Sequence, residues 1–163
     1  MQEHQKRILV ADDDNFTRET LRIVLTKAGF EVSTAQDGET ALSMTKEERP
    51  NLVVTDGLLP KLHGFLVCKA IKELDDPPRV IILTGVYTKP TYKWELIKEY
   101  GADVVLSKPF VPDDLVACIT KQLQIARDLD AQVTGAAQPD DHPPVVVMEE
   151  RAFAFAAPGE VVH

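Results

Sequence analysis

The sequence predicts an α/β fold, an open and doubly wound parallel sheet with helices on both faces. Five short apolar segments alternate with five segments of helical periodicity, which is the pattern of five successive βα units. The central apolar segments are nearly unbroken, as is typical of parallel strands covered on both faces. With 163 residues, 44% of them hydrophobic, the chain can form one domain with a substantial core and a short appendage.

The five expected strands are short apolar runs. They cover residues 7–11, 31–35, 51–55, 79–84 and 102–107. The first reads RILVA and the fourth RVIILT. Because βα units join by right-handed crossovers, these runs should form one parallel sheet with helices on both sides.

The five expected helices fill the intervals between the strands and follow the last one. They cover residues 16–29, 38–48, 64–74, 91–101 and 112–126. In the first helix the apolar residues recur at helical spacing, at Leu21, Val24, Leu25 and Ala28. Asn15 is placed to cap its start and Gly29 to end it. The last helix opens with Pro112 and two acidic residues, which favour a helix N-terminus.

The composition divides the chain into two parts. Residues 6–127 hold the five βα units and are expected to form one domain. Residues 128–163 are rich in Pro, Ala and acidic residues without a sustained period, which predicts a disordered tail or linker. The short apolar stretches PPVVVM and AFAFAA leave open that this tail docks on the same chain or on a partner.

Charge and hydropathy exclude several classes of partner. The chain has 18 basic and 26 acidic residues, a net charge of −8, and no cluster of Lys and Arg, so we expect no nucleic-acid partner. No signal peptide and no run near the roughly 20 apolar residues of a membrane span is present, which predicts no membrane partner and a cytoplasmic location. Cys68 and Cys118 stand alone at apolar helix positions, as reduced thiols in a core do.

Polar residues gather where the expected strands end. They are Asp12, Asp13 and Asp14 after the first strand, Asp56 after the third, Thr84 at the end of the fourth and Lys108 after the fifth. In an open α/β sheet the functional crevice lies beyond the carboxyl ends of the strands. Clustered carboxylates suit Mg²⁺. A carboxylate beside Mg²⁺ can attack phosphorus, while Lys108 and Thr84 would stabilise the charge on the phosphoryl oxygens.

This set of residues resembles the receiver domain of two-component response regulators, with a flavodoxin-like (βα)₅ fold. The matching elements are the acidic pair Asp12–Asp13, the DxxxPxxxG pattern from Asp56 to Gly64, the pair Thr84–Gly85 and the KPF sequence Lys108–Phe110. The resemblance covers most of residues 6–127. It implies the strand order 2-1-3-4-5 and a cis Lys108–Pro109 bond.

The resemblance also implies a role for each site residue. Asp56 would accept a phosphoryl group from a sensor histidine kinase or a phosphotransfer protein. Asp13, Asp56 and the Leu58 carbonyl would bind Mg²⁺ directly, and Asp12 would bind it through water. The chain would therefore be a phosphoacceptor rather than an enzyme, with only self-catalysed phosphotransfer and slow autodephosphorylation. Asp14 is interpreted as part of the helix start.

The chain departs from the receiver pattern at Val105, where receivers usually carry an aromatic residue that moves on activation. The segment 85–95 contains Tyr87, Tyr92 and Trp94. One hypothesis is that one of these aromatic residues replaces the missing one, or that this loop is itself the output surface. The alternative is a rigid loop whose aromatic residues pack on the fourth helix. The residues after Arg127 are too few for a typical output domain, so we expect signalling by contact with an unknown downstream protein.

Two other functions remain open. Haloacid-dehalogenase-type phosphatases also use an acidic pair like Asp12-x-Asp14, but Asp56 and the loop to Gly64 would then have no role. A phosphorylation-independent pseudo-receiver, which only binds partners, is suggested by Val105.

Overall fold

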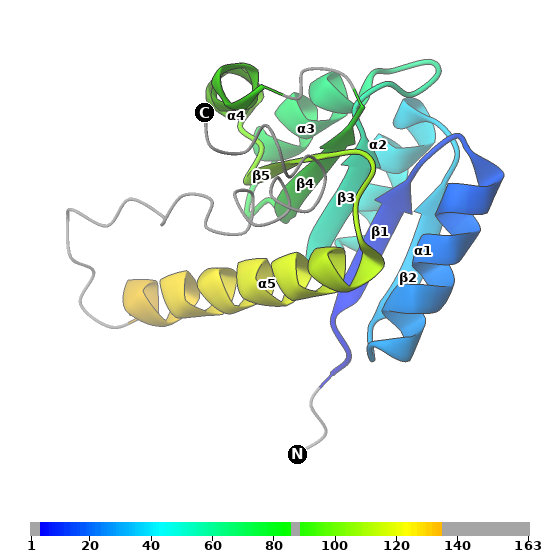
Figure 1. Cartoon of the computed structure of the whole chain (residues 1–163). Coiled ribbons are helices and arrows are strands. Elements are labelled where there is room, and N and C mark those ends of the chain that lie inside the picture. Colours follow the sequence, from blue (N-terminus) through cyan, green and yellow to red (C-terminus); the bar gives the residue numbers. More distant parts are fainter. Residues whose placement is uncertain (1–3, 86–88, 135–163) are drawn as a thin grey trace.

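The computed structural model describes residues 4–85 and 89–134 (Figure 1). The strands are β1 Arg7–Ala11, β2 Glu31–Ala35, β3 Leu52–Asp56, β4 Arg79–Thr84 and β5 Val104–Ser107. The helices are α1 Asn15–Lys27, α2 Gly38–Glu48, α3 Gly64–Lys72, α4 Pro90–Tyr100 and α5 Pro112–Thr134. None of the helices in these ranges is long and apolar enough to cross a membrane.

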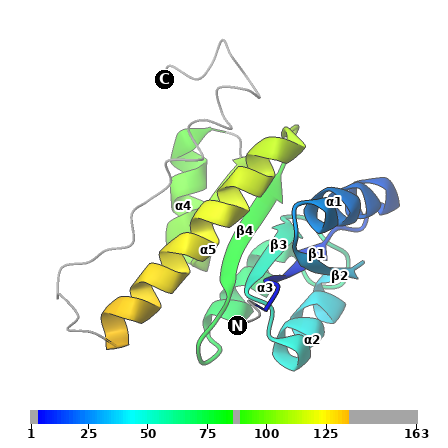
Figure 2. The same ribbon diagram turned by 90° about the horizontal axis from the view of Figure 1, so that it is seen from below.

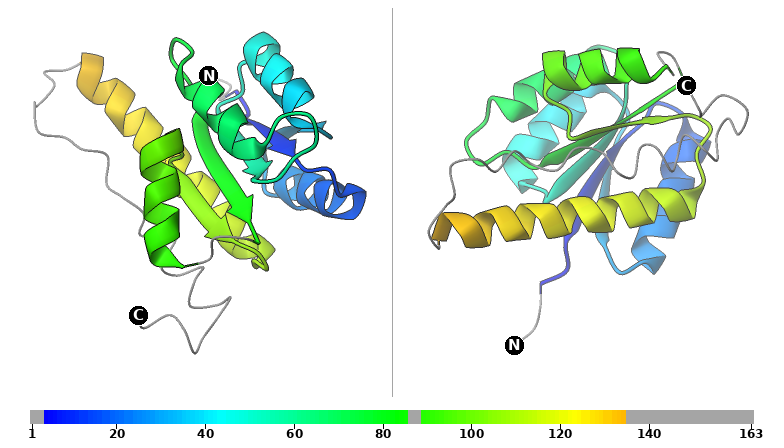
Figure 3. Two further views of the ribbon diagram at one scale, coloured as in Figure 1. Left: turned by 90° about the horizontal axis from the view of Figure 1, so that it is seen from above. Right: turned by 60° about the vertical axis from the view of Figure 1, so that its left-hand side comes forward.

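The five strands form one parallel sheet in the order β2-β1-β3-β4-β5, which confirms the predicted fold class and strand order. Helices α1 and α5 cover one face, and α2, α3 and α4 cover the other (Figures 1, 2 and 3). Each face of the sheet has its own hydrophobic core. Alternate residues of a strand contribute to the two cores, because side chains along a strand point to opposite faces. Val10 and Val54 pack with α1 and α5, whereas Leu9 and Val53 pack with α2 and α3.

The register of the sheet brings the polar strand ends together. Ala11 pairs with Thr55, Asp56 with Leu83, and Thr84 with Ser107, so the carboxyl ends of β1, β3, β4 and β5 lie side by side. These strands are almost completely buried up to their last residues. Polar side chains placed there are therefore held by a rigid, close-packed support.

Helix α1 begins one residue earlier than expected, and its cap is Asp14 rather than Asn15. Asp14 has extended backbone angles, and its carboxylate accepts a hydrogen bond from the Thr17 amide at 2.9 Å. Asn15 is already helical, so its side chain cannot reach back as an N-cap does. At the other end Gly29 has a φ of 98°, and its amide donates to the Thr26 carbonyl. The predicted stop at Gly29 is confirmed.

Helix α5 continues to Thr134, beyond the expected end at residue 126, and takes up the first residues assigned to the tail. The extra turns contain no Gly or Pro, and Leu129 is half-buried along the helix. The next helix-breaking residue in the sequence is Gly135. The orange end of α5 projects past the sheet in Figures 1 and 3. The expectation for residues 135–163 lies outside the described residues.

Candidate phosphoacceptor and metal site

The carboxylates of Asp12, Asp13 and Asp56 meet at the carboxyl ends of β1 and β3. One oxygen from each lies within 4.8 Å of the others. Asp12 is buried, Asp56 is half-buried and Asp13 is exposed, so the group is open on one side. Three hard oxygen donors at this spacing, with an open side for water, fit Mg²⁺, which retains several waters when it binds to proteins.

Lys108 brings a positive charge from the end of β5 to these carboxylates. Its Nζ lies 3.2 Å from Asp12 Oδ2 and 3.5 Å from Asp56 Oδ2. The backbone amide of Lys108 donates to the Thr84 carbonyl at 2.8 Å, which fixes the start of this segment against β4. The Lys108–Pro109 bond is cis, as the resemblance implied.

The pKa of Asp56 lies above its usual range, chiefly because its carboxyl group is partly buried. Burial raises the pKa of Asp56, the Lys108 ammonium lowers it, and the neighbouring Asp12 carboxylate raises it again. The Leu58 amide also donates a hydrogen bond to the carboxylate, which lowers the pKa. A divalent cation here would favour the ionised form that a nucleophile requires.

Asp12 is the most constrained of the acidic residues. Its side chain is 2% exposed, Oδ1 accepts a hydrogen bond from the Asp14 amide at 2.9 Å, and Oδ2 faces Lys108. Asp14 itself lies outside the carboxylate cluster, and its hydrogen bonds with Thr17 hold its pKa below the usual range. Asp14 therefore serves the helix start, as interpreted from the sequence.

The loop after Asp56 is held close to the site by glycine. The Gly57 amide donates to the Leu83 carbonyl at 2.8 Å, and the Gly64 amide donates to the Gly57 carbonyl at 2.9 Å. A Cβ at Gly64 would lie 1.8 Å from the Asp56 carbonyl oxygen, so only glycine allows this approach. Leu58, two residues after Asp56, is 48% exposed. Metal binding by the Leu58 carbonyl stays a prediction.

The residues expected to form the switch occupy different environments. Thr84 is buried at the end of β4, and Val105 is completely buried in β5 among apolar residues of the second core. Tyr92 and Trp94 belong to the first turns of α4 and are 43% and 52% exposed. Tyr87 lies outside the described residues. Tyr92 and Trp94 are thus available at the surface rather than placed at the Val105 position.

Two basic residues are buried without a recognisable signal in the sequence. Arg18 on α1 is 8% exposed, and its guanidinium donates to the Asp12 carbonyl at 2.8 Å. Lys93 is completely buried on α4, at helical spacing with the half-buried Leu96 and Ile97. Cations on amphipathic helices are normally solvated, so periodicity gave no reason to bury either of them.

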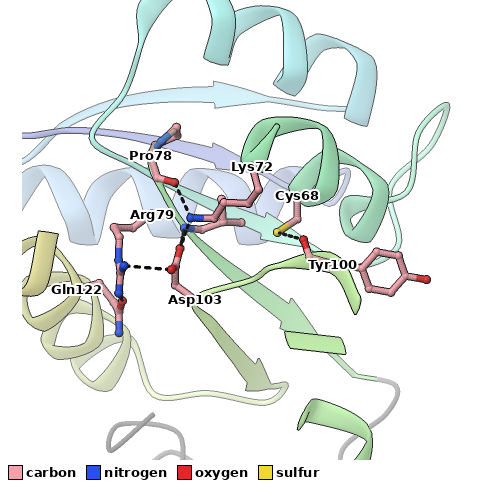
Figure 4. A network of polar contacts seen from close by, with 8 residues as sticks. Cys68, Lys72, Pro78, Arg79, Tyr100, Asp103 and Gln122 are labelled. Carbon is pink, nitrogen blue, oxygen red and sulfur yellow. Dashed lines mark hydrogen bonds and ion pairs between the residues drawn. The ribbon is translucent and has the colours of Figure 1, made fainter. Parts of the chain in front are cut away.

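A second polar network ties the opposite ends of β4 and β5 to α3 and α5 (Figure 4). Asp103 accepts from Lys72 Nζ at 2.6 Å and from the Val80 amide at 2.7 Å, and it lies 3.2 Å from Arg79 Nη1. Arg79 also donates to the buried Gln122. Each polar group here has a partner within the fold, which indicates a structural role.

Both cysteines are free and buried, as expected. The Cys68 thiol faces the Tyr100 carbonyl at 3.4 Å (Figure 4). Burial raises the pKa of Cys68 to about 12. The thiol therefore stays protonated at neutral pH, and a protonated thiol is a poor nucleophile and a poor metal ligand.

Comparison with known proteins agrees with this architecture. Residues 8–120 match the family model of the response regulator receiver domain. The probable transcriptional regulator ycf27 of Cyanophora paradoxa is 41% identical over 124 residues, which are 76% of this chain and 51% of that protein. The DNA-binding response regulator MtrA of Mycobacterium leprae is 37% identical over 136 residues, 83% of this chain and 59% of that protein. The chain spans about half the length of the curated relatives it matches.

Solved structures give the same result. The chemotaxis response regulator CheY4 of Vibrio cholerae superposes with a TM-score of 0.67 at 30% identity, covering 72% of this chain and 98% of that one. A CheY-like receiver domain protein of Methanospirillum hungatei gives a TM-score of 0.71 at 28% identity, covering 77% of this chain and 98% of that one. The family match runs through most of the described residues and includes Asp12, Asp56, Thr84 and Lys108, so the chain belongs to the response regulator receiver domain family.

Proposed function

We propose that this receiver accepts a phosphoryl group on Asp56 from the phosphohistidine of a sensor histidine kinase or a phosphotransfer protein. The observation that carries the proposal is the position of Lys108 Nζ, 3.2 Å from Asp12 and 3.5 Å from Asp56, beside an open cluster of three carboxylates. An anionic phosphoryl group could enter such a site only if positive charge were fixed there in advance.

In the proposed reaction a carboxylate oxygen of Asp56 attacks phosphorus, and the bond from phosphorus to the donor's imidazole nitrogen breaks. The product is an acyl phosphate on Asp56 and a free histidine on the donor. Lys108 would leave the Asp56 carboxylate and pair with a phosphoryl oxygen, and the Thr84 hydroxyl would donate to another. Bound Mg²⁺ would neutralise charge on the phosphoryl oxygens. Asp13, Asp56 and the Leu58 carbonyl would hold it, with Asp12 acting through water.

The choice of Asp56 over Asp12 as nucleophile is supported by their surroundings. The Asp12 side chain is only 2% exposed and is hydrogen-bonded to the Asp14 amide, whereas the Asp56 side chain is 16% exposed. A phosphatase of the haloacid-dehalogenase type would need the first-strand carboxylate to attack substrate. The less accessible carboxylate is a poor candidate for that role.

Labelling with acetyl phosphate in the presence of Mg²⁺ tests this proposal. Intact mass measurement of the wild-type chain should show one added phosphoryl group, and the Asp56→Asn variant should show none. Asp14→Asn is the matched control, because it removes an acid from the same loop and Asn remains a good N-cap. Asp12→Asn should still be labelled, more slowly. Labelling of Asp56→Asn, or its loss only in Asp12→Asn, would overturn the assignment.

A phosphorylation-independent interaction module is the second candidate, and the burial of Val105 in an apolar core favours it. Receivers of that kind should give the same amide spectrum with and without beryllofluoride and Mg²⁺. Widespread shifts at Thr84 and along α4 would exclude this candidate.

We also propose that the receiver signals by binding a downstream protein on the face formed by α4, β5 and α5. It is supported by the exposed Tyr92 and Trp94 on α4 and by the exposed Val111 before α5.

The downstream protein is unknown, and we expect it and the donor kinase domain to share the cytoplasm. We also retain 6–127 as the signalling domain and 128–163 as a separate tail, although the first part of that tail is helical.

A further inference from the structure

Arg18 is a buried cation that the proposed phosphotransfer chemistry does not use. It is 8% exposed, whereas Arg22, one turn further along α1, lies at the surface and pairs with Glu19 on the same helix. Arginine is seldom buried unless its donors are satisfied. The guanidinium of Arg18 donates two hydrogen bonds to described residues, one to the Asp12 carbonyl and one to Asn15 Oδ1, each at 2.8 Å. Neither acceptor is a carboxylate.

The first of these bonds acts on the peptide that joins Asp12 to Asp13. Because a peptide unit is planar, holding the Asp12 carbonyl also holds the Asp13 amide and the direction in which the chain leaves Asp12. Asp12 is fixed independently, since its amide donates to the Ala35 carbonyl and its carboxylate is bound by the Asp14 amide and by Lys108. Asp13 is exposed, so its orientation depends on the backbone that carries it.

We propose that Arg18 is a positioning residue that sets the orientation of Asp13 for cation binding through its hydrogen bond with the Asp12 carbonyl. Asn15 Oδ1 accepts a hydrogen bond from the second guanidinium nitrogen. This second bond holds the guanidinium in the orientation in which it donates to the Asp12 carbonyl. This inference rests on the proposed function only in taking Mg²⁺ as the ion of the acidic cluster.

The charge of Arg18 has the opposite effect on cation binding. A fixed positive charge near the cluster repels Mg²⁺, so removal of the charge alone would strengthen binding. Loss of the hydrogen bond would weaken binding by releasing Asp13. The two effects differ in sign, and the direction of the change in Mg²⁺ affinity therefore separates positioning from simple electrostatics.

The test is a Mg²⁺ titration of the full chain followed by amide NMR at Asp13 and Gly57. In Arg18→Gln we expect the dissociation constant for Mg²⁺ to rise about tenfold, the size expected when a hydrogen bond from a charged group is lost. Amide shifts at Asp13 should also change in the metal-free variant. Arg22→Gln is the matched control and should leave the dissociation constant unchanged. An unchanged or lower constant in folded Arg18→Gln would overturn the inference.

Two further variants keep the test decisive if Arg18→Gln folds poorly. Asn15→Ala removes the second partner and leaves the Asp12 bond, so it should weaken Mg²⁺ binding by less than Arg18→Gln. Arg18→Lys keeps the charge but cannot satisfy both acceptors in one plane, and it should also weaken binding. Wild-type affinity in both would overturn the inference. Failure of the wild-type chain to bind Mg²⁺ would instead refute the proposed function.

Discussion

Replacement of Lys108 tests how much its ammonium group stabilises the metal-free protein by neutralising the acidic cluster. Its ammonium lies 3.2 Å from Asp12 and 3.5 Å from Asp56, and its side chain is 27% exposed. For effective dielectric constants between about 80 and 20, each contact is worth about 1 to 5 kcal/mol before the desolvation of the charges is subtracted. Replacement by methionine keeps most of the apolar stem and leaves two carboxylates without their cation.

We expect Lys108→Met to lower the free energy of unfolding of the metal-free protein by about 2 kcal/mol. Fully buried pairs lose about 3 to 5 kcal/mol when one partner is removed, and the partial exposure of Lys108 reduces that figure. The loss should shrink when Mg²⁺ is present, since the ammonium and the metal compete for the same carboxylates. Mg²⁺ at about 100 times its dissociation constant adds about 2.7 kcal/mol to the stability of the protein that binds it.

Urea unfolding followed by far-UV circular dichroism, in EDTA and in saturating MgCl₂, measures both effects. Lys98→Met is the control, because Lys98 is an exposed lysine on α4 and its loss should change neither curve. The reasoning would be refuted if Lys108→Met were as stable as the wild type in EDTA. It would also fail if Mg²⁺ stabilised the variant less than the wild type.

Three further predictions concern the same end of the sheet. The free energy of unfolding of the wild type in EDTA should fall as pH rises from about 4 through the raised pKa of Asp56, since the folded state holds that proton longer. Asp56→Asn, measured by urea unfolding over the same pH range, should lack this decrease in the free energy of unfolding and be the more stable protein at pH 7. Gly64→Ala should lose about 1 to 3 kcal/mol in thermal unfolding, because its Cβ would meet the Asp56 carbonyl at 1.8 Å, whereas Gly85→Ala should lose little. The phosphorylated chain should lose its phosphoryl group over many minutes when followed by mass spectrometry, because the attacking water must pass the apolar Leu58 side chain. Decay within seconds, or a slower decay in Leu58→Gln, would contradict this.

Local patterns in the sequence predicted the five strands, the five helices except the last turns of α5, and the composition of the acidic site. Alternation of apolar runs with helical periodicity identifies βα units without knowledge of any contact. The rule that parallel strands present their carboxyl ends at one edge then gathers Asp12, Asp56, Thr84 and Lys108 in one crevice. The structure places Asp12 and Asp56 against Lys108 as that rule requires.

Tertiary structure decided how neighbouring groups of the same kind divide their roles. Asp14 rather than Asn15 caps α1, because Asp14 has extended backbone angles and the helix begins at Asn15. Asp12 is buried, and its carboxylate contacts the Asp14 amide and Lys108, while the adjacent Asp13 is exposed to solvent. Arg18 is buried and Arg22 is not, although both lie on the same amphipathic helix. Periodicity reports which face of an element meets the core, but the partners of a polar side chain depend on atoms that distant segments bring within hydrogen-bond distance.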